Sequence, residues 1–196
     1  MPVTPLRTLA FAAVLTALSP AAFAQSAPEW AMQAEESALT FTASQSGSPV
    51  KGRFQQFQAT IFFDPADPAA GSVEVVIAMA SATTDDATRD QTLKGPDLFA
   101  VEEHPRAVFK ADRFEQAEGE GAYIAPGELT LRGETRPVAL PFTLAIEGEG
   151  AGAEARAQGA VSINRLDFGV GQGDWKDTGT VADPVEIAID IRAVRR

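Results

Sequence analysis

Hydrophobic and polar residues alternate along most of the chain beyond residue 30. In the clearest run, every second residue from Val138 to Ile146 is apolar, and a second run of this kind extends from Val185 to Ile191. Shorter runs occupy Val73 to Met79 and Leu129 to Leu131. A period of two places the apolar side chains on one face of an extended backbone. These segments are therefore predicted to be half-buried antiparallel strands.

Weaker alternating runs bring the predicted number of strands to roughly eight. They surround residues 39–41, 57–63, 107–111 and 161–163, and turn-forming segments separate the runs at 46–49, 64–68, 118–121 and 147–153. Short strands with one apolar face must close on themselves or stack as two sheets. The chain has only two Trp and one Tyr, too few for the aromatic girdles of a barrel whose apolar face meets lipid. We therefore predict an all-β fold, an eight-stranded antiparallel barrel with an apolar interior that is either filled or holds one small ligand.

One segment, residues 85–103, breaks the alternation and is predicted to be an irregular insertion. Within it, Thr88 to Leu93 is predicted as a short helix that ends before Gly95 and Pro96. Pro141 lies inside the best strand, where its missing N–H indicates an edge, a bulge or a site at which no donor is needed. No repeat or linker divides the chain, so residues 25–196 are predicted to form a single domain.

The first 24 residues have the pattern of a secretory signal peptide. Arg7 supplies a positive charge, an apolar segment follows from Leu9 to Leu18, and Ala22-Phe23-Ala24 provides the small residues of a cleavage site. The apolar segment is too short to span a bilayer, which takes about 20 residues. We therefore expect cleavage near Ala24 and a periplasmic location for the mature protein.

Composition and charge exclude several classes of function. The chain of 196 residues has 16 Lys and Arg against 27 Asp and Glu, a formal net charge of −11, which argues against nucleic-acid binding. It has no Cys and one His, His104, in an acidic turn that we expect to be exposed. A thiolate nucleophile and a Cys/His metal site are therefore excluded. We predict a protein that is not an enzyme, with no catalytic residues, no metal and no resident cofactor.

Three motifs lie in order along the chain. The first is Arg89-Asp90-x-x-Leu93 with Asp97-x-Phe99, the second is the segment from Gly127 to Val138, GELTLRGETRPV, and the third is Ile163-Asn164-Arg165-x-Asp167-Phe168-Gly169. These motifs resemble those of the YceI-like family, exported lipocalin-like proteins that bind polyisoprenoids. With Gly52-x-Phe54, the resemblance covers about residues 30–194. The sequence departs from many relatives at Glu36-Ser37, where they have His-Ser, and at Gln91-Thr92, where they have a His.

The resemblance implies a lipocalin-like barrel around an elongated apolar cavity, and a carrier function. The implied ligand is a long-chain amphiphile: a polyprenol phosphate, a prenylated quinone or a fatty-acid derivative. The segment from Gly169 to Trp175 is similar to a subgroup associated with membrane-bound di-haem cytochromes. A membrane cytochrome and a second copy of the chain therefore stay open as partners. The alternative function is an accessory module of such a cytochrome or quinone system, with a packed barrel and no bound lipid.

The candidate ligand-binding residues combine apolar positions of the strands with a few residues of the irregular segments. They are Phe54, Phe57, Ile61, Phe63, Ile77, Arg89, Asp90, Phe99, Phe109, Leu129, Leu131, Phe142, Ile163 and Trp175. Each apolar residue is either packed core or ligand contact, and Trp175 either caps the cavity or covers core. Arg89, like Lys94 nearby, either meets an anionic or carbonyl head group or pairs with an acid and pins its loop. For Arg165 we expect a buried structural network that closes the barrel.

Overall fold

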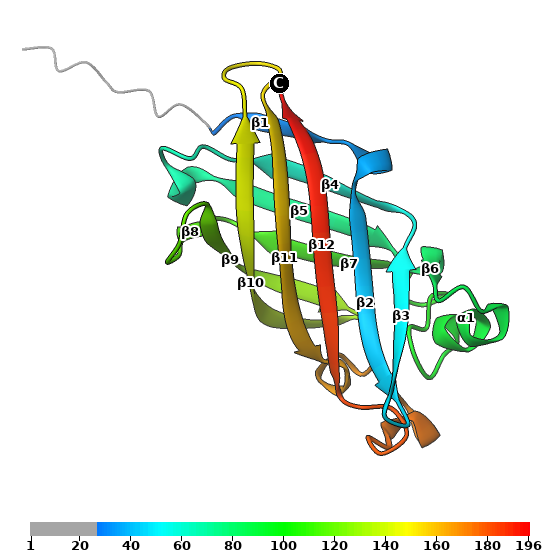
Figure 1. The fold of residues 1–196 in the computed structure, drawn as a ribbon. Coiled ribbons are helices and arrows are strands. Elements are labelled where there is room, and N and C mark those ends of the chain that lie inside the picture. The colour runs from blue at the N-terminus through cyan, green and yellow to red at the C-terminus, as the bar shows by residue number, and fades with distance from the viewer. Residues whose placement is uncertain (1–26) are drawn as a thin grey trace, which may run out of the picture.

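The computed structural model describes residues 27–196 and consists mainly of strands (Figure 1). The strands are β1 Glu29–Met32, β2 Ala38–Gln45, β3 Ser48–Phe54, β4 Phe57–Phe62, β5 Ser72–Ala78, β6 Ala82–Thr83, β7 Arg106–Ala111, β8 Glu115–Gln116, β9 Ala122–Leu131, β10 Glu134–Glu147, β11 Glu154–Asn164 and β12 Pro184–Arg195. The helix is α1 Ala87–Lys94, and the 3-10 helices are η1 Ala34–Glu36, η2 Pro68–Ala70, η3 Met79–Ser81, η4 Arg165–Phe168 and η5 Gly173–Lys176.

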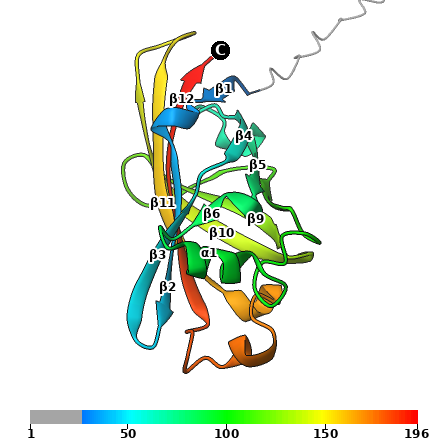
Figure 2. The ribbon, with the colours of Figure 1, turned by 90° about the vertical axis from the view of Figure 1, so that its right-hand side faces the viewer.

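The strands close into an eight-stranded antiparallel barrel, which confirms the predicted fold class. The hydrogen-bonded order β1-β4-β5-β7-β9-β10-β11-β12 returns to β1, where Trp30 pairs with Arg195. β1 and β2 lie one after the other along the same edge of β12, as two parts of one interrupted strand. β3 and β6 continue the sheet beyond β2 at the end of the barrel next to α1 (Figures 1 and 2).

The alternation read from the sequence is reproduced by the exposure of the side chains. Along β10, Val138, Leu140, Phe142, Leu144 and Ile146 are half-buried, and the residues between them are exposed. The inward side chains keep some exposure because the space they face is not completely filled. The predicted apolar face is thus the inner wall of the barrel.

Pro141 marks the point at which β10 and β11 separate. β10 pairs with β11 only from Phe142 to Glu147, whereas its pairing with β9 runs from Glu134 to Thr143. Up to Pro141, one side of β10 therefore has no strand partner, and a missing N–H costs no ladder bond there. Pro137 lies on the same unpaired stretch, and prolines at an open edge also discourage pairing with another chain.

The insertion between β6 and β7 contains the short helix predicted from the sequence. Asp86 caps α1 by accepting a hydrogen bond of 2.9 Å from the backbone N–H of Arg89. The predicted signal peptide and its cleavage site near Ala24 lie outside the described residues. Among residues 27–196, no helix is long and apolar enough to cross a membrane.

Candidate ligand cavity

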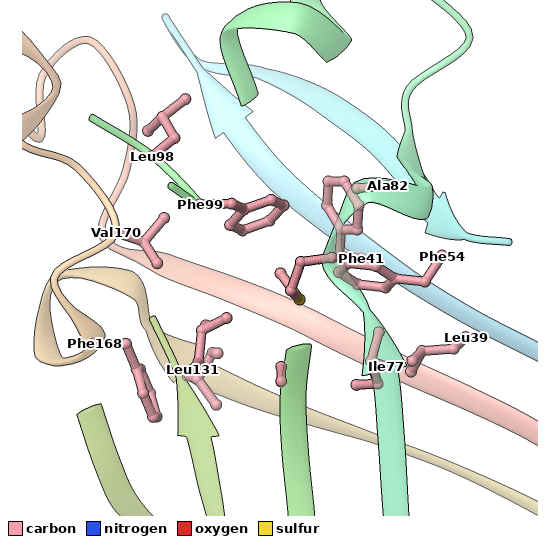
Figure 3. Close-up of a cluster of buried hydrophobic side chains, with 13 residues drawn as sticks. Leu39, Phe41, Phe54, Ile77, Ala82, Leu98, Phe99, Leu131, Phe168 and Val170 are labelled. Carbon is pink, nitrogen blue, oxygen red and sulfur yellow. The ribbon is translucent and has the colours of Figure 1, made fainter. Parts of the chain in front are cut away.

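The barrel encloses two apolar cavities, one toward each end. The larger has a volume of about 470 Å³ and lies at the end that carries α1 and the segment between β11 and β12. Figure 3 shows part of its wall, with Phe41, Phe54, Phe99, Leu131 and Val170 directed toward a common space. Its volume lies within the range of small-molecule sites, about 300–1,000 Å³.

Both strands and loops build the wall of the larger cavity. Phe54 of β3 packs between Phe41 and Phe99, with ring centroids 5.4 Å and 6.1 Å away. Of the predicted residues, Phe54, Ile77, Arg89, Phe99, Leu129, Leu131, Ile163 and Trp175 line this cavity. Trp175 lies on η5, is half-buried and packs against the core, so its ring both covers the core and forms part of the cavity wall.

The smaller cavity has a volume of about 120 Å³, and its lining exposes no polar surface. The predicted residues that line it are Phe57, Ile61, Phe63, Phe109 and Phe142. Phe63 makes edge-to-face contacts with Phe114 and Tyr123, with each pair of ring centroids 5.2 Å apart. Trp30 is 3% exposed and donates its indole N–H to the backbone oxygen of Phe63 at 2.9 Å. Aromatic side chains therefore pack together at this end of the barrel.

A polar rim surrounds the end of the larger cavity that reaches the surface. It comprises Thr84, Asp86, Thr88, Arg89 and Thr92, all in or beside α1. Arg89 is exposed, and among residues 27–196 its guanidinium makes no ion pair and donates no hydrogen bond. One interpretation of Arg89 was an ion pair with an acid, and no such pair forms among residues 27–196. The N–H groups of the Arg89 guanidinium therefore stay available at the rim.

Asp90 is the one predicted site residue that lines neither cavity. Its carboxylate accepts hydrogen bonds from the Thr83 hydroxyl at 2.6 Å, the Thr84 backbone N–H at 2.6 Å and the Thr84 hydroxyl at 2.7 Å. Desolvation opposes ionisation of Asp90, but these hydrogen bonds to its charged form outweigh it and lower its pKa below the ordinary value. Asp90 therefore holds α1 against β6 and positions Arg89.

A second polar contact fixes the turn that precedes α1. Arg53 of β3 forms a bidentate ion pair with Asp85, with N–O distances of 2.7 and 2.8 Å. The hydrogen bond from Arg53 lowers the pKa of Asp85, although both side chains are exposed. Together with Asp90, this pair joins the rim to the barrel wall.

Arg165 closes the barrel beneath the larger cavity, as expected from the sequence. It is 4% exposed and donates to the backbone oxygens of Ala182, Val170 and Val181 at 3.1, 2.8 and 2.7 Å. Burial lowers its pKa, and the nearby charge of Asp183 opposes that shift. The guanidinium thus holds together both ends of the segment that connects β11 to β12.

The same end is braced by contacts between irregular segments. The backbone N–H groups of Gly171 and Gln172 both donate to the backbone oxygen of Asp97. The guanidinium of Arg132 donates to the backbone oxygen of Pro96 at 2.6 Å. His104, predicted to be exposed, is half-buried because its ring packs over Gly133. A Cβ at Gly133 would lie 2.9 Å from that ring, so glycine allows the β9–β10 turn to approach the insertion.

Comparison with known proteins places this barrel in a family. A model described as YceI-like domain matches residues 30–193. The chain belongs to the YceI-like family. It is 30% identical to a UPF0312 protein of Ectopseudomonas mendocina, over 84% of this chain and 85% of that protein. The crystal structure of Burkholderia cenocepacia BcnA, 33% identical, superposes with a TM-score of 0.77 and covers 83% of this chain and 99% of that one.

A more distant YceI-like fold neighbour is a domain from Saccharophagus degradans described as polyisoprenoid-binding. It is 15% identical, with a TM-score of 0.64, over 86% of this chain and 99% of that one. Of the positions at which the sequence departs from many family members, Thr92 lines the larger cavity, whereas Glu36, Ser37 and Gln91 line neither cavity. Glu36 is exposed on η1, 3.8 Å from Arg192, and Gln91 is exposed on α1.

Several lining residues were absent from the sequence-based prediction. Leu39, Trp30, Phe114 and Val170 all line a cavity, and each is less than 9% exposed. Leu39 belongs to the weak alternating run at residues 39–41, so that pattern could have predicted that its side chain points inward. Phe114 and Val170 lie outside the main strands, and no periodicity marks them. Among residues 27–196, no group of three or more His, Cys, Asp or Glu side chains is placed to hold a metal ion.

Proposed function

We propose that this YceI-like protein is an exported carrier that shields a long-chain amphiphile from water inside its barrel. The observation that carries the proposal is the mainly apolar cavity of about 470 Å³ that has a polar rim beside α1. A ligand with a hydrocarbon tail and a polar head fits such a cavity in one orientation. Its tail enters the barrel, and its head stays at the rim.

Affinity for the tail comes from removing it from water. Each buried methylene contributes about 0.8 kcal/mol, and the wall of the smaller cavity offers aliphatic and aromatic side chains without polar surface. The Saccharophagus domain of the same fold, described as polyisoprenoid-binding, supports a prenyl chain as the tail. Prenylated quinones, polyprenol phosphates and fatty-acid derivatives all have the required shape.

Arg89 is the proposed contact for the head group. It lines the cavity, is exposed, and has no ion-pair partner within the described chain. A guanidinium binds a phosphate or carboxylate through two parallel hydrogen bonds. Asp90 keeps α1 in place and thereby directs Arg89 to the rim.

The proposed location is the periplasm. Arg7, the apolar segment from Leu9 to Leu18 and the Ala22-Phe23-Ala24 site together support export and cleavage near Ala24. There the carrier would move or store a lipid between membranes. N-terminal sequencing of the protein recovered from the periplasm would reveal the cleavage site, and a chain retained in the cytoplasm would contradict this location.

The central test is mass spectrometry of an organic extract from protein purified out of the periplasm. We expect one class of single-headed, long-chain lipid. An empty extract from a folded protein would contradict the carrier function. If the same preparation contained a membrane cytochrome at a fixed ratio, the accessory module would be the better description.

The role of Arg89 is tested with farnesyl phosphate and farnesol, which share a tail and differ in the head. Arg89→Gln should weaken binding of farnesyl phosphate by roughly tenfold because a charge-assisted hydrogen bond is lost. Binding of farnesol should change little. Arg106→Gln is the matched control, since Arg106 is an exposed arginine that lines neither cavity. An equal loss in both variants would contradict a specific role of Arg89.

A further inference from the structure

The two cavities meet at a single shared residue. Leu39 of β2 is 4% exposed and lines both the larger and the smaller cavity. It pairs with Ile189 of β12 on one side and with Phe54 of β3 on the other. Its side chain therefore lies in the inner wall at the level where one cavity ends and the other begins.

The residues around Leu39 place the boundary within one layer of side chains. On β12, Ile187 lines the larger cavity and Ile189 the smaller. On β5, Ile77 lines the larger cavity and Val75 the smaller. Inward residues two positions apart are neighbours on the same face of a strand, so nothing thicker than side chains separates the two spaces. Figure 3 shows Leu39 beside Ile77, at the end of the cluster opposite to Leu98 and Val170.

The two cavities differ in which part of an amphiphilic ligand each of them can hold. The larger has a polar rim and reaches the surface, whereas the smaller, at about 120 Å³, has a lining without polar surface. A tail that enters at the rim meets Leu39 before it can reach the smaller cavity. At about 120 Å³, the smaller cavity has room only for the end of one hydrocarbon chain.

We propose that the ligand has a single chain and that Leu39 determines the length of tail the protein accepts. This inference rests on the proposed carrier function and adds a specificity-determining residue to it. A tail that ends before Leu39 leaves the smaller cavity empty. A tail that passes Leu39 gains the contacts of Phe63, Phe109 and Phe142. A lipid with two acyl chains fits less well, because the smaller cavity, at about 120 Å³, takes the end of one chain only.

The test measures the affinity of a series of prenols: geraniol, farnesol, geranylgeraniol and longer homologues. For the unchanged protein, affinity should rise by about fourfold for each further buried methylene and then level off once the smaller cavity is full. Leu39→Phe adds bulk at the constriction, so the levelling-off should shift to a shorter prenol. Leu39→Ala widens the passage and should raise the ratio of geranylgeraniol to farnesol affinity by at least threefold.

Val185→Phe is the matched control, because Val185 lines only the larger cavity. It should lower the affinity for every prenol without moving the length at which affinity levels off. Should Leu39→Phe fail to fold, judged by circular dichroism, the alanine variant decides the question on its own. A length profile that is the same in both Leu39 variants and the unchanged protein would overturn the role of Leu39.

Two further outcomes separate this inference from the carrier function. If no prenol and no fatty acid binds the unchanged protein, the carrier function itself fails. If prenols bind but the protein also extracts dioleoylphosphatidylglycerol from vesicles at a one-to-one ratio in native mass spectrometry, the carrier function stands and the single-chain restriction fails. Two prenol molecules bound per protein chain would likewise contradict a single tail that crosses the constriction.

Discussion

The two ends of the barrel are built from the same alternating strands but differ in how they are closed. At the end of the smaller cavity, Phe63, which follows β4, packs against Phe114 and against Tyr123 of β9, and Trp30 ties β1 to Phe63. At the end of the larger cavity, irregular segments close the barrel through polar contacts to backbone oxygens, with Arg165 at their centre. The strands thus provide an apolar interior at both ends, and the loops make one end hollow and accessible.

The largest expected effect is the truncation of an aromatic ring at the tightly packed end. Phe63→Ala should destabilise the protein by about 3–5 kcal/mol, because its contacts with Phe114 and Tyr123 are lost and a cavity is left. Phe54→Ala should cost at least 1 kcal/mol less, since Phe54 borders the cavity of about 470 Å³ and Phe63 the one of about 120 Å³. Urea denaturation of both variants provides the measurement. Equal losses would mean that the two ends are packed alike.

Removal of the guanidinium that closes the hollow end should have the next largest effect. Arg165→Met leaves the oxygens of Val170, Val181 and Ala182 without their donor, and we expect a loss of about 3 kcal/mol in the free energy of unfolding. Hydrogen exchange should rise in residues 165–183 and stay unchanged around Phe63. Faster exchange across the whole barrel would contradict a role restricted to this end.

A smaller effect is expected from the contact that fixes α1. Asp90→Asn should destabilise the protein by about 1 kcal/mol, since the hydrogen bonds from Thr83 and Thr84 lose a charged acceptor. Because the pKa of Asp90 is lowered on folding, its contribution is present above the unfolded pKa, near 4, and is lost as pH falls through the folded value. The difference in stability between Asp90→Asn and the unchanged protein should therefore shrink below about pH 4. A constant difference from pH 7 to pH 3 would show that the charge of Asp90 is not involved.

The smallest effect is expected from an ion pair on the outer wall around the smaller cavity. Arg156 and Asp190 pair across β11 and β12, with an Nε–Oδ1 distance of 2.8 Å, and the hydrogen bond from Arg156 lowers the pKa of Asp190. Both side chains are partly exposed, so Arg156→Gln should cost no more than about 1 kcal/mol and less at high salt. A loss as large as that of Phe63→Ala would mean that polar contacts also hold the aromatic end.

Strands and helix could be predicted because each leaves a local pattern. The run from Val138 to Ile146 has the period of a strand, and Gly95-Pro96 after Thr88 to Leu93 has the chemistry of a helix end. Candidate residues such as Phe57 and Phe142 followed from the same alternation. The division of the interior into two cavities did not, since it depends on which inward residues of non-adjacent strands reach the same level.

For individual polar residues too, the sequence indicated which residues matter, and the structure decided what each of them contacts. Arg89 was identified from a motif, but its lack of an ion pair and its place at the rim follow from the packing of α1 on β6. Asp90 was predicted with Arg89 as a ligand contact, but in the structure its carboxylate accepts hydrogen bonds from Thr83 and Thr84. Neighbours in sequence have different functions here because successive residues of a helix point in different directions.

By itself, the sequence determined that this chain forms a closed antiparallel barrel with an apolar interior. Period-two alternation is a local property, and eight half-apolar strands have few ways to hide their apolar faces. Only the tertiary structure decided that Leu39 lines both cavities, that Arg165 closes one end and that Arg89 lies at the rim without an ion-pair partner among residues 27–196. These features depend on contacts between residues far apart in the chain, and no local pattern encodes such contacts.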